Sequence, residues 1–173
     1  MSKDLRTFLG EVRQLGPDYF VSVSKRVDPV FEPCVIQQKL LAEGKTPVIR
    51  FENVNGSKLP LTSNLFGSYE LLGLALGVDP GTPKSEILGR FRERVQKPLA
   101  PDEIARENAP VKQVVYKDGD IDLSKLPILQ HAEMDSGKYI TVGCLVIRDP
   151  DSGILNAGIC RHMVQGKDRI GAM

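Results

Sequence analysis

The sequence predicts an α+β protein, with an N-terminal α/β domain followed by antiparallel strands. In the N-terminal part, apolar residues recur at helical spacing in some stretches and alternate with period two in others. From about residue 110 onward, apolar runs are joined by short turns that contain Gly and Asp, as is typical of an antiparallel sheet. The change between these two sequence patterns places a domain boundary near residue 110, between segments 1–110 and 111–173.

The first segment begins with two helices separated by a strand. Leu5, Phe8 and Val12 recur at helical spacing, and Gly16-Pro17 favours the end of that helix. A second helix is expected after Asp28-Pro29, with Gly44 at its end. The expected elements are a helix at 5–15, a strand at 18–27 and a helix at 29–44.

A hairpin and further helices are expected next. Asn55-Gly56 suits a tight turn between two short apolar runs. Ser85 is a candidate cap for a helix, and Pro101, Asp102 and Glu103 favour a short first turn. The expected elements are a hairpin within 46–63, helices at 67–77 and 84–96, and a short helix from 101.

The second segment reads as a series of strands. A β-rich section starts in "PVKQVVYKDGDIDLSKLP" and continues through "KYITVGCLVIRD", the turn "PDSG", "ILNAGICRHMV", the turn "QGKD" and "RIGAM". The chain stops at Met173, within or just after a strand, which would leave a sheet edge unpaired. This predicts a truncated second domain, or one that another chain completes.

Composition excludes several classes of protein. The formal net charge is +1, so no bulk attraction to nucleic acid or to an anionic membrane is expected. The longest apolar runs fall short of the ~20 residues that span a bilayer. Cys34, Cys144 and Cys160 are odd in number and lie in apolar surroundings, which favours reduced thiols in the cytoplasm. With no Cys-x-x-Cys pair and only two histidines, a structural zinc site is not expected.

The stretch "GILNAGICRHM", residues 153–163, carries an amide and a guanidinium within an apolar run. Asn156 and Arg161 are five residues apart, so a regular strand would send them to opposite faces. A bulge at Gly158 would bring them toward one site. Arginine suits a phosphate or carboxylate, and an amide oxygen suits a hard cation. On spacing alone, a solvated strand face is the simpler interpretation of both residues.

The stretch "LPILQHAEMDSGKYITVGCLVIRDPDSGILNAGICRHM", residues 126–163, resembles the cofactor-binding signature of the UbiD family of prenylated-flavin-dependent decarboxylases. The earlier stretch "VDPVFEPCVIQQKLLAEGKTPVIRFENVNGSKLPLTSNLFGS" is similar to the N-terminal α/β domain of that family. The resemblance implies that segment 111–173 is the truncated start of a split β-barrel that binds flavin. Family members are much longer than this sequence.

The resemblance also implies roles for individual residues. Asn156 matches the amide ligand of a divalent metal, usually Mn²⁺, that bridges to the phosphate of prenylated FMN, with K⁺ as a further candidate ion. Arg161 matches the catalytic arginine that meets the substrate carboxylate, and Thr141 matches, more loosely, a position near the substrate pocket. The residues that match the stretch along the cofactor are Asn156, Ala157, Gly158, Ile159, Cys160 and Arg161. Cys160 is expected to be a packed thiol rather than a nucleophile.

The implied activity is the reversible non-oxidative decarboxylation of an aromatic or α,β-unsaturated carboxylic acid. A flavin prenyltransferase would supply the cofactor, and the complete protein would be a homo-oligomer. The remaining metal ligands and the proton-donating acid are expected after residue 173, so the chain alone is expected to be inactive. The alternative is a non-catalytic subunit that docks in a two-chain assembly; a flavin reductase or oxidase on a split barrel explains the Asn-x-Gly-Ile-x-Arg run less well.

Overall fold

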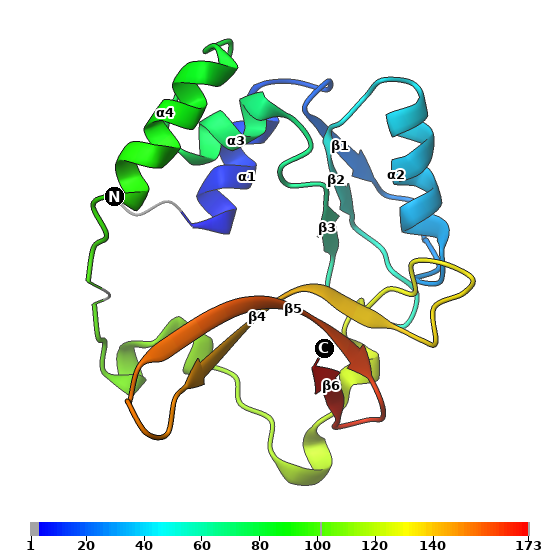
Figure 1. Ribbon diagram of the computed structural model, residues 1–173. Helices are drawn as coiled ribbons and strands as arrows, with labels where there is room; N and C mark the ends of the chain where they lie inside the picture. Colours follow the sequence, from blue (N-terminus) through cyan, green and yellow to red (C-terminus); the bar gives the residue numbers. More distant parts are fainter. Residues whose placement is uncertain (1–3, 101, 173) are drawn as a thin grey trace. The chain divides into compact units, whose positions relative to one another are not determined.

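The computed structural model describes residues 4–100 and 102–172, which form a mixed α+β fold (Figure 1). Its strands make two three-stranded sheets, ordered β1-β2-β3 and β4-β5-β6. The elements are α1 (Leu5–Gln14), β1 (Phe20–Val23), α2 (Glu32–Ala42), β2 (Val48–Phe51), β3 (Leu61–Ser63), α3 (Tyr69–Ala75), α4 (Lys84–Val95), β4 (Tyr139–Arg148), β5 (Leu155–Val164) and β6 (Ile170–Ala172). Short 3₁₀ helices lie at Arg106–Asn108, Pro110–Lys112, Asp118–Asp120 and Leu123–Lys125.

The chain divides into two compact units, and the first contains residues 4–23, Lys39–Arg50 and Thr62–Lys117. Its core is a cluster of buried apolar side chains from α1, β1, β2 and α3: Phe8, Val12, Phe20, Val48 and Leu71. The two helices that contribute to this cluster have polar caps. Asp4 Oδ1 accepts the Thr7 N–H at 2.7 Å at the start of α1, and Ser68 Oγ accepts the Leu71 N–H at the start of α3.

The second unit joins Ser24–Gln38 and Phe51–Leu61 to residues 118–172. Val30 forms a parallel bridge with Gln130, and Val27 forms one with Val54. Ser57 Oγ donates a hydrogen bond to the Lys125 carbonyl at 2.8 Å. Two stretches from the N-terminal half of the sequence therefore brace the segment that leads into β4.

The β4–β5 hairpin is the longest regular structure of the second unit (Figure 1). Its antiparallel register runs from Arg148 opposite Leu155 to Tyr139 opposite Met163. The register shifts between Ile140 and Gly143, so Thr141 and Val142 together face Arg161. Among the described residues, strand β6 pairs with β5 at residues 162–164.

Most of the expected elements are confirmed, including all four long helices and the three C-terminal strands. The 46–63 hairpin is confirmed in part: β2 and β3 are neighbours in one sheet, but the turn at Asn55-Gly56 lies inside the longer connection 52–60. The expectation of strands in 110–127 is wrong, because Asp118, Asp120 and Asp122 favour local turns there, and 3₁₀ helices form. Ser85 is not the cap of α4, because Pro83 takes that position with an extended backbone and Ser85 lies inside the helix. Asp102 and Glu103 are not helical, and Pro101 lies outside the described residues.

No described helix has the length and apolar character needed to cross a membrane. Cys34, Cys144 and Cys160 are all free thiols. Burial, and secondarily the charge of Asp135, raises the pKa of the Cys34 thiol, which lowers the fraction present as the nucleophilic thiolate.

Gly143 gives a test of the β4–β5 packing. A Cβ added at Gly143 would lie 2.5 Å from Nε2 of the buried His162 and closer still to Cδ2. We expect Gly143→Ala to lower the free energy of unfolding by about 1–3 kcal/mol, because the imidazole ring must move within a packed sheet. Urea unfolding followed by circular dichroism measures this change.

Gly158→Ala is the matched control on the facing strand. A Cβ added there would meet only the Cys160 Sγ, at 3.9 Å, within 4 Å. We expect its free energy of unfolding to stay within about 0.5 kcal/mol of the wild-type value. Equal losses for both variants would contradict the close contact of Gly143 with His162.

The hairpin turn should depend on pH through Asp149. Its Oδ1 accepts the N–H groups of Ser152 at 2.6 Å and Asp151 at 3.0 Å, and the Ser152 hydroxyl at 2.9 Å. The hydrogen bonds from Ser152 come first among the causes that hold the pKa of Asp149 below its ordinary value of 3.8. Because the folded pKa is lowered, the stabilisation is complete above pH 3.8 and is lost as the pH falls through the folded pKa.

We therefore expect the Ser152 amide proton to exchange faster at low pH, as measured by NMR. Asp149→Asn keeps an acceptor oxygen but does not titrate, so its exchange should show no such acid transition beyond the intrinsic one. The same acid transition in both proteins would show that Asp149 is not its source.

Candidate functional site

The predicted site residues lie on β5 and on the part of β4 that faces it. Asn156 is opposite Ile147, Ala157 is opposite Val146, and Gly158 is opposite Leu145. Near the other end of β5, Arg161 faces Thr141 and Val142 in the bulge. The structure therefore brings Thr141 next to Arg161, and it places Asn156 about half a strand away along the same backbone.

The bulge is on β4 and not at Gly158, where the sequence suggested it. The register of β5 against β4 is regular from Leu155 to Cys160. With regular alternation, Asn156 shares a face with Gly158 and Cys160, while Arg161 lies on the opposite face. The expectation that a bulge at Gly158 turns both polar side chains toward one site is wrong. Because Asn156 and Arg161 lie on opposite faces, one ligand can contact both only if it runs along the edge of the strand.

Arg161 carries a free positive charge. Its side chain is exposed, and it forms no ion pair with any residue in 4–100 or 102–172. Its Cζ lies 4.7 Å from the centroid of the Tyr139 ring. Tyr139 is 6% exposed, and its hydroxyl donates to Met163 Sδ at 3.0 Å. Arg161 thus rests on a buried ring and keeps its N–H groups available to an anion.

Asn156 offers one oxygen ligand. It is exposed, and its amide makes no side-chain hydrogen bond within the described chain. A divalent ion of this class takes about six ligands. Among the described residues no group of three or more His, Cys, Asp or Glu side chains could hold a metal ion. The chemistry of Asn156 fits a hard cation, but the described residues do not complete a metal site.

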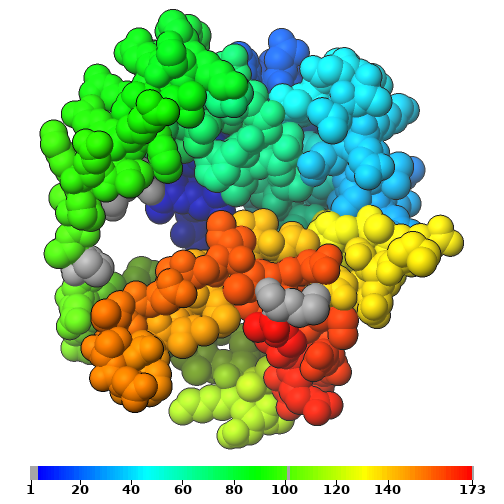
Figure 2. Space-filling model, viewed as in Figure 1, coloured from blue at the N-terminus to red at the C-terminus, as the bar shows by residue number. Residues whose placement is uncertain are grey.

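The stretch between Asn156 and Arg161 is open to a ligand. Ile159 is 77% exposed and Ala157 is exposed, while Gly158 has almost nothing within contact distance of an added Cβ. Residues 155–161 have β4 on one side and, in the described chain, no strand on the other. Figure 2 shows side chains of the hairpin, in orange, at the molecular surface. A flat molecule could find both apolar contacts and free backbone hydrogen-bonding groups along this edge.

Sequence reasoning missed Tyr139, Met163 and the environment of His162. His162 is 6% exposed, and its Nδ1 has no hydrogen-bond partner in the described chain. Tyr139 stands two residues before Thr141 in "KYITV", and a register count across the "PDSG" turn would have paired it with Met163 only if the bulge had been known. Asp135 is a turn residue, because its Oδ2 accepts the N–H groups of His131 and Ala132.

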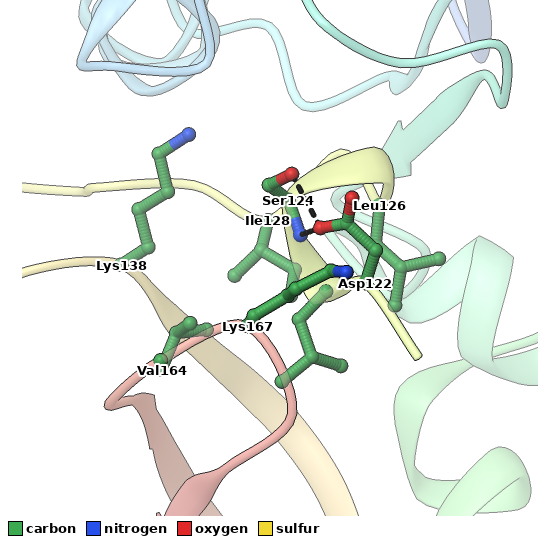
Figure 3. A pocket seen from close by; sticks show the side chains of 9 residues that line it. Asp122, Ser124, Leu126, Ile128, Lys138, Val164 and Lys167 are labelled. Atoms are coloured by element: carbon green, nitrogen blue, oxygen red, sulfur yellow. Dashed lines mark hydrogen bonds between the residues drawn. The ribbon is translucent and has the colours of Figure 1, made fainter. Parts of the chain in front are cut away.

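A cavity of about 540 Å³ lies elsewhere in the second unit, and none of the predicted site residues lines it (Figure 3). Asp122 Oδ1 accepts the backbone N–H and hydroxyl of Ser124, which are the main cause of a lowered Asp122 pKa. Lys167 Nζ donates to the Gly119 carbonyl at 3.1 Å. The cavity is lined by Asp122, Leu123, Ser124, Leu126, Ile128, Lys138, Val164, Gly166 and Lys167. Its polar groups are thus largely engaged in holding the 118–128 segment.

Two family models match the chain. Residues 17–95 match the N-terminal domain of 3-octaprenyl-4-hydroxybenzoate carboxy-lyase, and residues 102–173 match the Rift-related domain of the same enzyme. The second match contains all of the predicted site residues.

Similar proteins include two that are named as decarboxylases. The chain is 37% identical over 169 residues to anhydromevalonate phosphate decarboxylase of Methanosarcina mazei, covering 96% of this chain and 35% of that protein. It is 34% identical over 176 residues to phenolic acid decarboxylase of Sedimentibacter hydroxybenzoicus, covering 98% and 36%. The chain therefore spans little more than a third of the length of these relatives.

Solved structures of decarboxylases share the fold of this chain. The closed form of vanillic acid decarboxylase from Sedimentibacter hydroxybenzoicus matches with a TM-score of 0.91 and 32% identity, covering 99% of this chain and 37% of that one. The UbiD-class enzyme HmfF from Pelotomaculum thermopropionicum, in an evolved dimeric form in complex with prFMN, matches with a TM-score of 0.86 and 34% identity, covering 98% and 38%. The two model matches, the sequence relatives and the shared fold together show that the chain belongs to the UbiD family of prenylated-FMN-dependent decarboxylases and corresponds to the N-terminal part of its longer members.

Proposed function

We propose that the chain is the N-terminal part of an enzyme that reversibly decarboxylates an aromatic or α,β-unsaturated carboxylic acid with prenylated FMN and Mn²⁺. The observation that carries this proposal is the unpaired guanidinium of Arg161 on a strand whose flank is open from residue 155 to residue 161. Support also comes from the relatives, since two are named as decarboxylases and one solved structure holds prFMN.

In this proposal each residue of the strand has a separate task. Arg161 binds the substrate carboxylate through paired N–H bonds and holds it in line for loss of carbon dioxide. Asn156 Oδ1 supplies one ligand to the metal ion, and Thr141 borders the substrate beside Arg161. Ala157, Gly158, Ile159 and Cys160 would form the wall along which the cofactor lies. Prenylated FMN, when bound, supplies the electron-accepting chemistry that no side chain can provide.

The arrangement of the whole protein follows from the same proposal. The barrel part would begin near residue 111, and a flavin prenyltransferase would supply the cofactor. We further propose a homo-oligomer in the cytoplasm, where the three free thiols would stay reduced. K⁺ is a further candidate ion beside Mn²⁺.

One observation favours the alternative of a docking subunit without chemistry of its own. Several apolar side chains of the β4–β5 hairpin are more than half exposed: Val142, Val146, Ile147, Leu155 and Ile159. An exposed apolar face of this kind is typical of an interaction surface, and another protein chain would bury it. Turnover by the complete assembly that is lost when Arg161 is replaced supports the enzyme proposal, and turnover that does not depend on Arg161 supports the docking subunit.

Two substitutions test the roles of Arg161 and Asn156 in the complete protein loaded with prenylated FMN and Mn²⁺. Arg161→Ala should lower kcat/KM by at least about 100-fold while the cofactor stays bound, because the carboxylate loses its charged partner. Asn156→Ala should weaken metal and cofactor retention by at least about tenfold, because one metal ligand is lost. Steady-state kinetics, metal analysis and the flavin absorbance spectrum measure these effects.

Arg148→Ala is the matched control. Arg148 lies on the same hairpin, but its guanidinium donates to the Gly153 carbonyl at the turn. We expect its kcat/KM to stay within about threefold of the wild-type value. Full activity in both Arg161→Ala and Asn156→Ala would remove the basis of the proposed site.

The chain of 173 residues by itself should give no turnover, even with prenylated FMN and Mn²⁺ added. The described residues provide one metal ligand and no acid in an ion pair with Arg161, whereas the reaction needs a closed metal site and a proton donor. Release of carbon dioxide from benzoate and cinnamate is the measurement. Turnover above the rate without protein would show that the necessary groups are already present in this chain.

A further inference from the structure

We propose that Tyr139 is a positioning residue, and that its buried ring holds the Arg161 guanidinium in the orientation that receives a carboxylate. The proposal rests on the proposed function, in which Arg161 binds the substrate carboxylate. Tyr139 itself touches neither the substrate nor the cofactor in this proposal. It acts through Arg161.

The geometry of the pair is that of a cation–π contact. Arg161 Cζ lies 4.7 Å from the ring centroid, inside the roughly 6 Å limit for such contacts. The two partners differ sharply in exposure, since Tyr139 is buried and Arg161 is exposed. A rigid surface on one side therefore limits the rotamers of a long side chain that is otherwise open to solvent.

Tyr139 is itself held through its backbone and through its ring hydroxyl. The Tyr139 N–H donates to the Leu129 carbonyl at 2.9 Å, and the hydroxyl donates to Met163 Sδ at 3.0 Å. Met163 is directly opposite Tyr139 in the register and two residues after Arg161, so all three side chains share one face. The platform below Arg161 is thus fixed by backbone pairing and by a side-chain contact.

The bulge explains why Arg161 lies over Tyr139 and not over a direct neighbour. Thr141 and Val142 share the position across from Arg161, so no single side chain pairs with it. The ring of Tyr139, diagonal to Arg161 on the same face, is the surface that the guanidinium contacts. Because the guanidinium carries five N–H donors and forms no ion pair in the described chain, its contact with one ring leaves donors for a carboxylate.

A first experiment reads the contact without any substitution. Arginine-selective labelling of the complete protein and NMR should show the Arg161 side-chain protons shifted upfield by the ring current of Tyr139. Arg148 is the internal reference, because its guanidinium bonds to a turn carbonyl and is in no ring contact in the described chain. Arg161 protons at the same shifts as those of Arg148 would overturn the proposal.

A second experiment removes the ring and measures carboxylate binding, with benzoate as the probe. Tyr139→Leu should weaken benzoate binding and raise the KM for substrate by about five- to tenfold, with a smaller change in kcat, because a cation–π contact of this kind is lost. Tyr139→Phe keeps the ring and should restore both values to within about twofold of wild type. A purely structural role for Tyr139 would not separate KM from kcat in this way.

Tyr69→Leu is the matched control. Tyr69 makes a cation–π contact of its own, with Lys84 Nζ 4.1 Å from its ring centroid, in the first unit. This variant loses a tyrosine and a cation–π contact but should bind benzoate as the wild type does. Weaker binding here would show that tyrosine loss acts through general stability, and it would count against the proposal.

The outcomes separate this proposal from the proposed function. If Arg161→Ala loses benzoate binding and a folded Tyr139→Leu keeps it, Tyr139 does not position Arg161 and the proposed function stands. If Arg161→Ala binds benzoate like the wild type, the proposed carboxylate site itself fails, and this proposal fails with it. If Tyr139→Leu does not fold, the ring-current shift decides.

Discussion

The antiparallel pairing of β4 with β5 is the constraint on which the rest of the candidate site depends. The register decides which side chains meet, and one extra residue in β4 shifts every neighbour beyond it. On one face the bulge leaves Arg161 without a direct partner. On the other face, Gly143 lies beside the buried His162 ring, in a space that no larger residue could share without movement. A change at either place would alter the position of the guanidinium even if Arg161 itself were untouched.

The second unit is assembled from stretches that are far apart in the sequence. The bridges of Val30 with Gln130 and of Leu129 with Tyr139 connect the N-terminal half of the chain to the start of β4. The Phe31 N–H also donates to the Gln130 carbonyl at 3.0 Å, from a residue with a φ of 69°. A non-glycine residue with positive φ is uncommon, and the neighbouring Val30–Gln130 bridge holds Phe31 in this conformation. The strand that begins at Tyr139 is therefore anchored by residues that a linear boundary near 110 would assign to the other segment.

The sequence predicted those elements that local signals determine. Helical spacing found α1 and α2, and the Gly and Asp residues of "PDSG" located the β4–β5 turn, where Asp149 accepts the backbone N–H groups. The 110–127 stretch was misjudged because its valines suggested strands, while 3₁₀ helices form there and Asp122 Oδ1 accepts the Ser124 N–H at the start of one of them. The β4 bulge has no local signature, since Thr141 and Val142 are ordinary strand residues. Without knowledge of the bulge, counting the register from the turn gives the wrong neighbours for both Arg161 and His162.

The free flank of β5 has a consequence for how the molecule behaves among its copies. Over residues 155–161, every second residue turns its N–H and C=O away from β4, and no strand of the described chain takes them up. Such a row is a template on which any passing strand can pair, including the same segment of another molecule. A cofactor lying along this edge would occupy that row. Loading the cofactor would then do more than supply chemistry, because it would also remove the surface through which empty molecules can associate.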